Sequence, residues 1–273
     1  MRLGEIGRAT LRCDMPPWPY PKILAHRGAG RLAPENTLAA FKHAYRLGQR
    51  MFEFDVKLSA DEVPVLMHDA DLERTSNGIG PLGAHTWSAL ATLDAGSWHS
   101  PQFAGEPIPR LDKLAEWLLS RGLMANVEIK PSPGADARSG EVIADLCARL
   151  WREVEVPCLL SSFSESALRA ARQAAPALPR ALLMDRLTPD WLARCRALDC
   201  VAADWNAAVL SPALLRDAHA AGLRVLAYTV NDPGLARRLI AWGTDAVITD
   251  AVDQLKPGDF EQEGEGRAQI LPP

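Results

Sequence analysis

The chain lacks the features that mark membrane-spanning, secreted and nucleic-acid-binding proteins. Its 273 residues contain no apolar run long enough to cross a bilayer, and residues 1–20 carry charges in place of the apolar centre of a secretory signal. The formal net charge is −4, with Lys and Arg dispersed, so we expect neither nucleic-acid binding nor stable membrane insertion. The five cysteines are scattered and include no Cys-x-x-Cys pair, which indicates reduced thiols in a cytoplasmic protein.

One further absence narrows the choice of fold. No Gly-x-Gly-x-x-Gly turn follows any expected strand, which argues against the competing fold, a doubly wound sheet. What the chain does contain is a regular alternation of short apolar runs with amphipathic helical patterns. The runs that we expect to be parallel strands cover residues 23–26, 52–58, 125–130, 157–161, 180–183, 200–203, 224–230 and 245–248. Eight βα repeats in a chain of this length predict an α/β fold, the TIM (β/α)8 barrel.

Local patterns add detail at the second strand and at the first helix. The run at residues 64–68 follows the strand at 52–58 after a connection far shorter than the dozen or more residues of a parallel crossover, so we expect an antiparallel hairpin. Residues 37–47 are expected to form an amphipathic helix, with Asn36 as its N-cap and Gly48 at its C-terminal stop.

The composition along the chain suggests three parts. We expect an irregular leader over residues 1–20, a barrel domain over residues 21–252 and a flexible tail over residues 253–273. Residues 70–109 are rich in Gly, Ser, Pro and Trp and are too many for a simple loop. We therefore expect a small inserted lobe there, after the second strand.

Charged side chains gather on the expected strands. Glu53 and Asp55 lie two residues apart, so they point the same way, and Glu128 and Lys130 do so on the next parallel strand. Carboxylates side by side on a buried face repel one another and lose solvation, and a hard divalent cation relieves both costs. Glu53, Asp55 and Glu128 are therefore predicted ligands of Mg²⁺ or Ca²⁺.

Histidines and cations complete the constellation. His26 and Arg27 end the first strand, and His68 ends the hairpin arm. Two histidines can transfer protons near neutral pH, while Arg27 and Lys130 can hold phosphate oxygens. Each pattern alone also has a purely structural interpretation: Glu-x-Asp can be a solvated strand face, and a strand-end His can be a hydrogen-bonded structural residue. The expected convergence of these residues at one end of a barrel favours a role in catalysis and metal binding.

At these residues the chain resembles the glycerophosphodiester phosphodiesterase family. The resemblance covers about residues 22–250 and is carried by motifs in a fixed order: His26-Arg27-Gly28, Pro34-Glu35-Asn36-Thr37, Glu53-Phe54-Asp55-Val56, Val65-Leu66-Met67-His68-Asp69, Ile108-Pro109-Arg110-Leu111, Val127-Glu128-Ile129-Lys130-Pro131, Thr229-Val230-Asn231 and the stretch from Gly243 to Asp250.

The resemblance implies hydrolysis of glycerophosphodiesters, such as glycerophosphocholine or glycerophosphoethanolamine, to an alcohol and sn-glycerol 3-phosphate. It assigns acid–base catalysis to His26 and His68, divalent-metal binding to Glu53, Asp55 and Glu128, and phosphate contacts to Arg27 and Lys130.

Two further positions follow from the same resemblance. Glu35 is expected to orient the glycerol or a metal-bound water, or else to cap the first helix. Tyr228 stands where the family commonly has Trp; it keeps an aromatic wall and adds a hydroxyl on the glycerol side of the pocket.

Two alternatives remain open at this stage. One is a related barrel phosphodiesterase that acts on lysophospholipids, and the other is a noncatalytic barrel that binds phosphodiesters. The second alternative would need no acid–base pair, which disfavours it. The sequence carries no signal for an oligomeric state.

Overall fold

The computed structural model describes residue 15 and residues 18–260. The predicted leader at residues 1–20 and tail at residues 253–273 therefore lie largely outside the described residues. The described chain alternates strands with helices. The strands are β1 (Ile23–His26), β2 (Met51–Leu58), β3 (Pro64–Leu66), β4 (Met124–Ile129), β5 (Leu159–Ser162), β6 (Arg180–Met184), β7 (Ala202–Asn206), β8 (Arg224–Tyr228) and β9 (Ala246–Thr249). The α-helices are α1 (Leu38–Arg46), α2 (Trp87–Leu90), α3 (Leu111–Leu119), α4 (Asp136–Leu150), α5 (Glu165–Ala174), α6 (Trp191–Ala197), α7 (Pro212–Ala220) and α8 (Pro233–Trp242).

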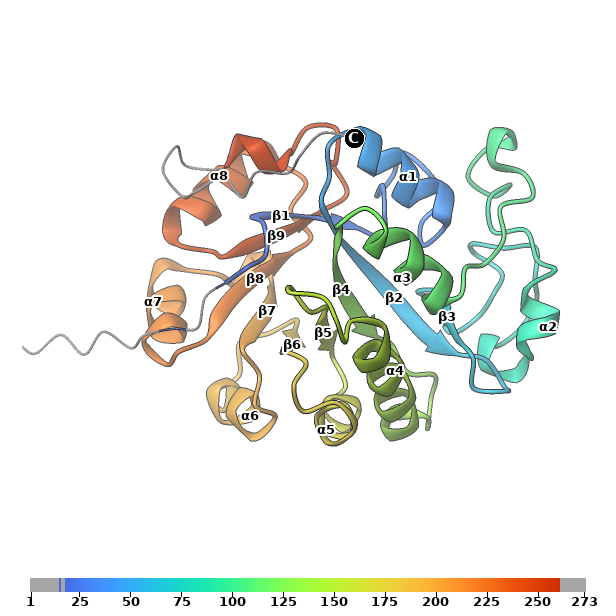
Figure 1. Cartoon of the computed structure of the whole chain (residues 1–273). Coiled ribbons are helices and arrows are strands. Elements are labelled where there is room, and N and C mark those ends of the chain that lie inside the picture. Colours follow the sequence, from blue (N-terminus) through green and yellow to red (C-terminus); the bar gives the residue numbers. More distant parts are fainter. Residues whose placement is uncertain (1–14, 16–17, 261–273) are drawn as a thin grey trace, which may run out of the picture.

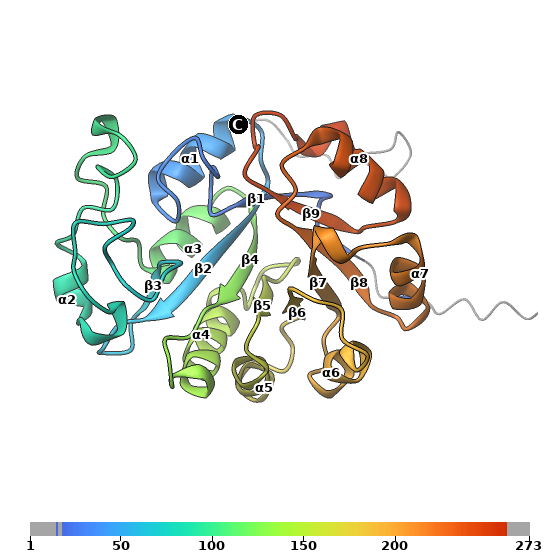
Figure 2. The ribbon, with the colours of Figure 1, turned by 180° about the vertical axis from the view of Figure 1, so that it is seen from behind.

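Eight of the strands form a closed parallel barrel. The order is β1-β9-β8-β7-β6-β5-β4-β2, and parallel pairing of β1 with β2 closes the ring. Helices α1 and α3 to α8 surround the strands (Figures 1 and 2). This arrangement confirms the predicted TIM barrel. Within the described residues, none of the helices combines the length and apolar character that a membrane-crossing segment needs.

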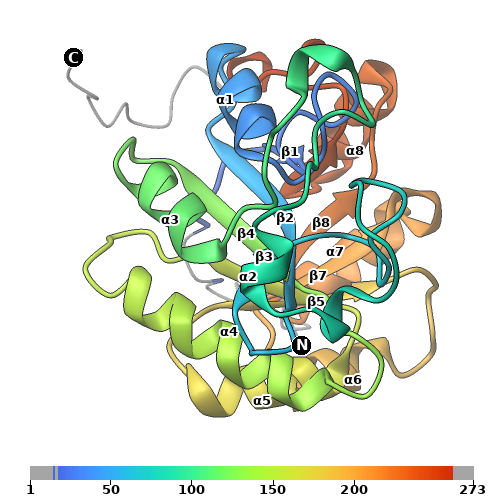
Figure 3. The same ribbon diagram turned by 90° about the vertical axis from the view of Figure 1, so that its right-hand side faces the viewer.

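Strand β3 lies outside the barrel. It pairs antiparallel with the end of β2, as the hairpin prediction requires. The segment between β3 and α3 has little regular structure besides α2 and two short 3₁₀ turns, Leu82–Ala84 and Pro101–Phe103. It projects beside the barrel next to β2 and β3 and faces the viewer in Figure 3.

The barrel interior changes from apolar to polar along the strands. Leu24, Met51, Leu159, Ala202 and Leu226 pack together inside the barrel as part of one buried apolar cluster. Since alternate strand residues share a face, the residues two positions further along point into the same interior. Those residues are His26, Glu53, Ser161, Asp204 and Tyr228. Each of these five strands thus supplies an apolar side chain to the barrel interior and then, two residues further along, a polar one.

The outward face of β2 fixes the position of that strand. Phe52 and Phe54 alternate with the acidic residues and pack edge-to-face against Phe41 of α1, with ring centroids 5.5 and 5.6 Å apart. Such pairs contribute roughly 0.5–1.5 kcal/mol each beyond the burial of area. Docking of α1 on β2 therefore directs Glu53 and Asp55 toward the interior.

The cap of α1 corrects a prediction. Thr37, rather than Asn36, is the N-cap, and its hydroxyl accepts a hydrogen bond from the Ala40 N–H at 3.3 Å. Asn36 instead adopts a left-handed conformation, φ 58°, and its side chain turns to β2. Asn36 tolerates this region better than most residues, so the Asn-Thr order places the amide at the site and the hydroxyl at the helix.

Strand β7 corrects a second prediction. The strand expected at residues 200–203 is observed at Ala202–Asn206, and it is buried through Trp205. The Ala-Ala-Asp-Trp pattern has no continuous apolar run, so the sequence alone ended the strand before Asp204. The observed register puts Asp204 inside the barrel, opposite Leu183 of β6 and Leu226 of β8.

Candidate active site

Most of the candidate residues line one cavity at the carboxyl end of the barrel. The cavity has a volume of about 230 Å³. Seven of the nine candidates wall it: His26, Arg27, Glu53, His68, Glu128, Lys130 and Tyr228. The other two, Asp55 and Glu35, form ion pairs with Arg27. The structure therefore brings together residues spread over more than two hundred positions of the chain.

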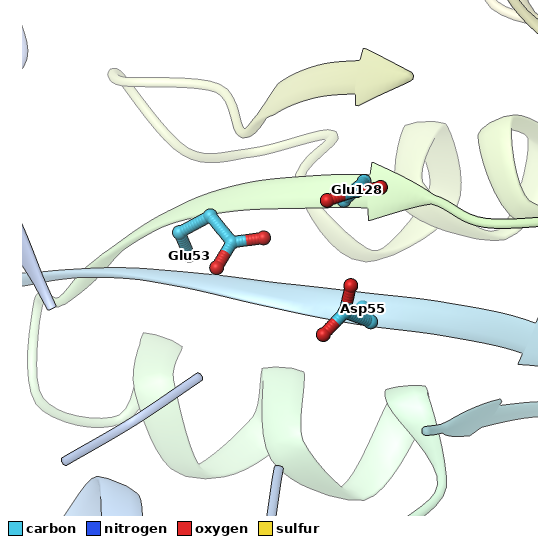
Figure 4. A group of neighbouring side chains, drawn as sticks. All are labelled: Glu53, Asp55 and Glu128. Atoms are coloured by element: carbon cyan, nitrogen blue, oxygen red, sulfur yellow. The ribbon is translucent and has the colours of Figure 1, made fainter. Parts of the chain in front are cut away.

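The three acidic candidates face one another between β2 and β4, as Figure 4 shows. Parallel pairing places Asp55 beside Glu128. One carboxylate oxygen from each of Glu53, Asp55 and Glu128 lies within 4.8 Å of the others, and all three residues are buried. Burial, reinforced by the neighbouring negative charges, raises the pKa of Glu53 well above its ordinary value and that of Glu128 to about 7.

The residues fit a divalent cation. Glu53 Oε1 is buried and accepts no hydrogen bond from the described residues. An orphaned carboxylate oxygen beside two other carboxylates is costly unless a cation joins it. The donor set is oxygen alone, which suits Mg²⁺ or Ca²⁺ rather than a structural zinc ion.

Two cations balance part of this negative charge. Lys130 Nζ lies 3.1 Å from both Asp55 and Glu128, and Arg27 Nε lies 3.3 Å from Asp55. Burial works to raise the pKa of Asp55, but Lys130 and Arg27 outweigh it and hold the pKa below its ordinary value. Asn36 adds a hydrogen bond from its amide to Asp55 at 2.9 Å. Asp55 thus stays ionised at neutral pH, while its neighbours compete for protons.

The turn after β1 presents Arg27 to the cavity. Arg27 adopts a left-handed conformation, φ 51°, and Gly28 follows at φ 95°. A Cβ at Gly28 would lie 2.8 Å from Ala40 Cβ of α1, so a larger residue would push the helix away. Glycine at this position lets the chain turn sharply between the strand and the first helix.

Each candidate histidine is paired with an aspartate. His26 Nδ1 lies 2.6 Å from Asp250 Oδ1, and His68 Nδ1 lies 2.7 Å from Asp69 Oδ1. A carboxylate at Nδ1 favours the tautomer that leaves Nε2 to exchange protons with a substrate. Asn231 holds Asp250 in place through a hydrogen bond of 2.9 Å. The two pairs approach the cavity from β1 and from the arm after β3.

The environment of His68 sets its charge in the free protein. Burial lowers the pKa of His68, and Arg27 and Lys130 lower it further, against the opposite effects of Asp55 and Asp69. His68 is therefore mostly neutral at pH 7 when no anion is bound.

Glu35 belongs to a network that the sequence did not predict. Its carboxylate accepts a hydrogen bond from Arg27 at 2.9 Å and two from Arg74 at 2.8 Å each. Arg74 also binds both oxygens of Asp69, the partner of His68. Arg74 therefore connects the segment after β3, which carries His68 and Asp69, to the turn after β1, which carries Glu35. Glu35 does not cap α1, because Thr37 does.

Tyr228 contributes an aromatic ring to the cavity wall. Its hydroxyl donates to Asp185 Oδ1 at 2.8 Å, and its ring packs edge-to-face on Phe163 at 5.8 Å between centroids. Both rings line the cavity.

Sequence reasoning missed several of these residues, and only some left a signal. Asp69 directly follows His68. Asp250 directly follows the last strand, β9, whose Thr249 pairs with Ala25 next to His26, so the closure of the barrel predicts the pair of His26 with Asp250. Arg74 left no comparable signal, since its partners lie five and thirty-nine residues away in irregular segments.

A model of the glycerophosphoryl diester phosphodiesterase family matches residues 26–254. The chain is 32% identical over 240 residues to a glycerophosphodiester phosphodiesterase of Caldanaerobacter subterraneus subsp. tengcongensis, covering 85% of this chain and 95% of that protein.

Solved structures match at the level of the whole barrel. One is an Oleispira antarctica phosphodiesterase in complex with the product sn-glycerol-3-phosphate, with a TM-score of 0.81 and 34% identity over 86% of this chain and 94% of that chain. Another is a glycerophosphodiester phosphodiesterase from Agrobacterium tumefaciens, with a TM-score of 0.71 and 31% identity over 86% of this chain and 98% of that chain.

Proposed function

Because the chain belongs to the glycerophosphoryl diester phosphodiesterase family and is a phosphoric diester hydrolase, we propose that it cleaves glycerophosphodiesters to an alcohol and sn-glycerol 3-phosphate. The proposed substrates are diesters such as glycerophosphocholine and glycerophosphoethanolamine. We propose that His26 and His68 transfer protons and that the reaction depends on a divalent cation held by Glu53, Asp55 and Glu128.

The observation that carries this proposal is the convergence of three kinds of group on one cavity. Carboxylates for a cation, the cations Arg27 and Lys130 for a phosphate, and two histidine–aspartate pairs all meet there. A binding protein needs the first two kinds but has no use for a paired acid and base.

The chain's own residues are suited to a reaction in which the glycerol hydroxyl attacks the phosphorus. The 2-hydroxyl is already tethered, so little orientation has to be supplied. His26 takes the proton of that hydroxyl as its oxygen bonds to phosphorus, and His68 gives a proton to the departing alcohol as its P–O bond breaks. Water then opens the cyclic phosphate with the two roles exchanged. The bound divalent cation supplies Lewis-acid polarisation of a phosphoryl oxygen.

The bound substrate adjusts His68 for its role. A phosphodiester anion beside Arg27 and Lys130 offsets the positive charges that lower the pKa of His68 in the free site. The histidine then holds a proton more readily when there is an alcohol to receive it. Direct attack by water is the alternative route, and detection of the cyclic phosphate during turnover separates the two.

The proposed activity is tested by the release of sn-glycerol 3-phosphate from a panel of diesters. Purified protein with Mg²⁺ or Ca²⁺ is expected to act on glycerophosphocholine and glycerophosphoethanolamine in preference to lysophosphatidylcholine. A preference for lysophosphatidylcholine would favour a lysophospholipid-cleaving barrel. Tight binding of a glycerophosphodiester without turnover would instead indicate a noncatalytic protein.

Arg74 is expected to act as a positioning residue. The Arg74→Met variant loses the hydrogen bonds to Glu35 and Asp69 while leaving the cavity wall intact, so kcat should fall by about 10–100-fold, as for other outer-shell partners. Arg74→Lys keeps the charge without the two-pronged geometry and is expected to recover part of the rate.

A surface arginine provides the matched control for Arg74. Arg138 makes similar pairs with Glu62 and Glu141 on an exposed face, so Arg138→Met should leave kcat unchanged. Equal values of kcat for the Arg74→Met and Arg138→Met variants would show that Arg74 does not position the catalytic groups.

A further inference from the structure

The closed end of the cavity is lined by polar side chains that have no role in the mechanism above. Asn126 on β4, Ser161 on β5 and Asp204 on β7 line it, and each is 0% exposed. Both polar atoms of the Asn126 amide, the Ser161 hydroxyl and both oxygens of Asp204 lack hydrogen-bond partners among the described residues. These three residues are here called the polar floor.

The barrel could fold with apolar side chains in place of the polar floor. Met124, Leu159 and Ala202, two residues earlier on the same strands, pack in the apolar interior. Side chains of the same apolar kind at the next level would have completed the core. Burying polar groups without partners is costly, and three of them around one cavity indicate a partner that the chain itself does not supply.

The chemistry of the floor narrows the partner. An amide and a hydroxyl both donate and accept hydrogen bonds. The Asp204 carboxyl group adds two buried oxygens that accept hydrogen bonds from hydroxyls. A set of donors and acceptors that contains no basic side chain complements hydroxyl groups. A phosphate is better served by the two cations that also line the cavity, Arg27 and Lys130.

The position of the floor distinguishes the two ends of a diester substrate. Phe163 is 42% exposed and marks the open end of the cavity, whereas the floor is closed. Glycerophosphodiesters differ in the alcohol that leaves and share the glycerol. A closed end suits the constant part, and the open end leaves room for the variable one.

We propose that Asn126, Ser161 and Asp204 form a subsite that binds the free hydroxyls of the glycerol moiety. The terminal hydroxyl, which is farthest from the phosphate, reaches deepest into the floor. The subsite selects for glycerol over a plain alkyl group, since a site built for a hydroxyl leaves its polar groups unpaired when the hydroxyl is missing. This inference rests on the proposed function and names the residues that enforce its specificity.

The test compares two phosphate monoesters with the same carbon skeleton. sn-Glycerol 3-phosphate carries two hydroxyls and n-propyl phosphate carries none. Calorimetric titration of the metal-loaded protein is expected to give a dissociation constant about 100-fold lower for glycerol 3-phosphate. In Ser161→Ala, Asn126→Leu and Asp204→Leu the affinity for glycerol 3-phosphate should fall, while that for n-propyl phosphate stays unchanged.

The variants are chosen to survive folding. Ser161→Ala removes one oxygen and nothing else, and Asp204→Asn keeps the shape and hydrogen-bonding capacity and should retain most of the discrimination. An equal loss of affinity for both ligands, or an unchanged ratio in Ser161→Ala and Asp204→Leu, overturns the subsite. Wild-type protein that binds both esters equally well overturns the subsite alone. Wild-type protein that binds neither and releases no glycerol 3-phosphate from the diester panel overturns the proposed function itself.

Discussion

Replacement of His26 or His68 by alanine is expected to lower the turnover of glycerophosphocholine by about 10³-fold, within the range of general acid–base contributions. Each ring is held by its own aspartate, His26 by Asp250 and His68 by Asp69, so neither imidazole can replace the other. The loss should appear in kcat, since the groups that bind phosphate and cation are untouched. The measurement is the release of sn-glycerol 3-phosphate at saturating substrate, with the far-ultraviolet spectrum and melting temperature as evidence of folding.

A third histidine supplies the control. His85 lies in the segment between β3 and α3, and its ring contacts only a backbone carbonyl, that of Ile79, among the hydrogen bonds of the described residues. His85→Ala is expected to keep the wild-type rate. A near-normal rate in folded His26→Ala or His68→Ala protein would show that the ring is structural.

The barrel was predictable because its signal is local and repeated. Each βα unit shows an apolar run followed by an amphipathic helical pattern. The connection after Leu58 is too short for a parallel crossover, so it predicted the antiparallel hairpin that is observed. Boundaries were less certain where propensity and burial disagree. At β7 the strand continues through Asp204, because a closed barrel with a polar cavity tolerates a carboxyl group that an apolar core would exclude.

The site was predictable as far as strand geometry reaches. Glu53 and Asp55 had to share a face, and Phe52 and Phe54 on the other face decide that this face is the interior. Contacts between irregular segments were beyond that reasoning. The bridge that Arg74 makes between Glu35 and Asp69 depends on how the chain between β3 and α3 folds back, which no periodicity encodes.

Residues with two local interpretations were decided by tertiary contacts. Asn36 is of a residue type that often caps helices, and so is the adjacent Thr37. In the structure Thr37 caps the helix, and the Asn36 side-chain amide donates a hydrogen bond to Asp55. Its main contribution is to a buried carboxylate, where a hydrogen bond to a charged group is worth about 1.5–3 kcal/mol. A single sequence cannot rank these two partners.

Removal of divalent cations is expected to abolish activity. Glu53, Asp55 and Glu128 crowd three carboxylates into a buried space that Lys130 and Arg27 only partly neutralise. EDTA should therefore silence the enzyme, and Mg²⁺ or Ca²⁺ should restore it. Because the cation binds the folded state, it should also raise the melting temperature in proportion to the logarithm of its concentration.

Glu53→Gln separates metal binding from folding. The substitution replaces a carboxyl group, whose pKa is raised by burial and then by the charges of Asp55 and Glu128, with a neutral amide. The metal-free protein should therefore melt at the wild-type temperature or above it. The cation-dependent rise in melting temperature should shrink, and activity should need far more Mg²⁺ or Ca²⁺. Glu116→Gln is the matched control and should keep both responses, because Glu116 lies on the exposed face of α3, where its carboxylate pairs with Lys113. Full activity in the presence of chelator would show that the reaction needs no divalent cation. A wild-type metal response in the Glu53→Gln variant would show that Glu53 is not a ligand of the cation.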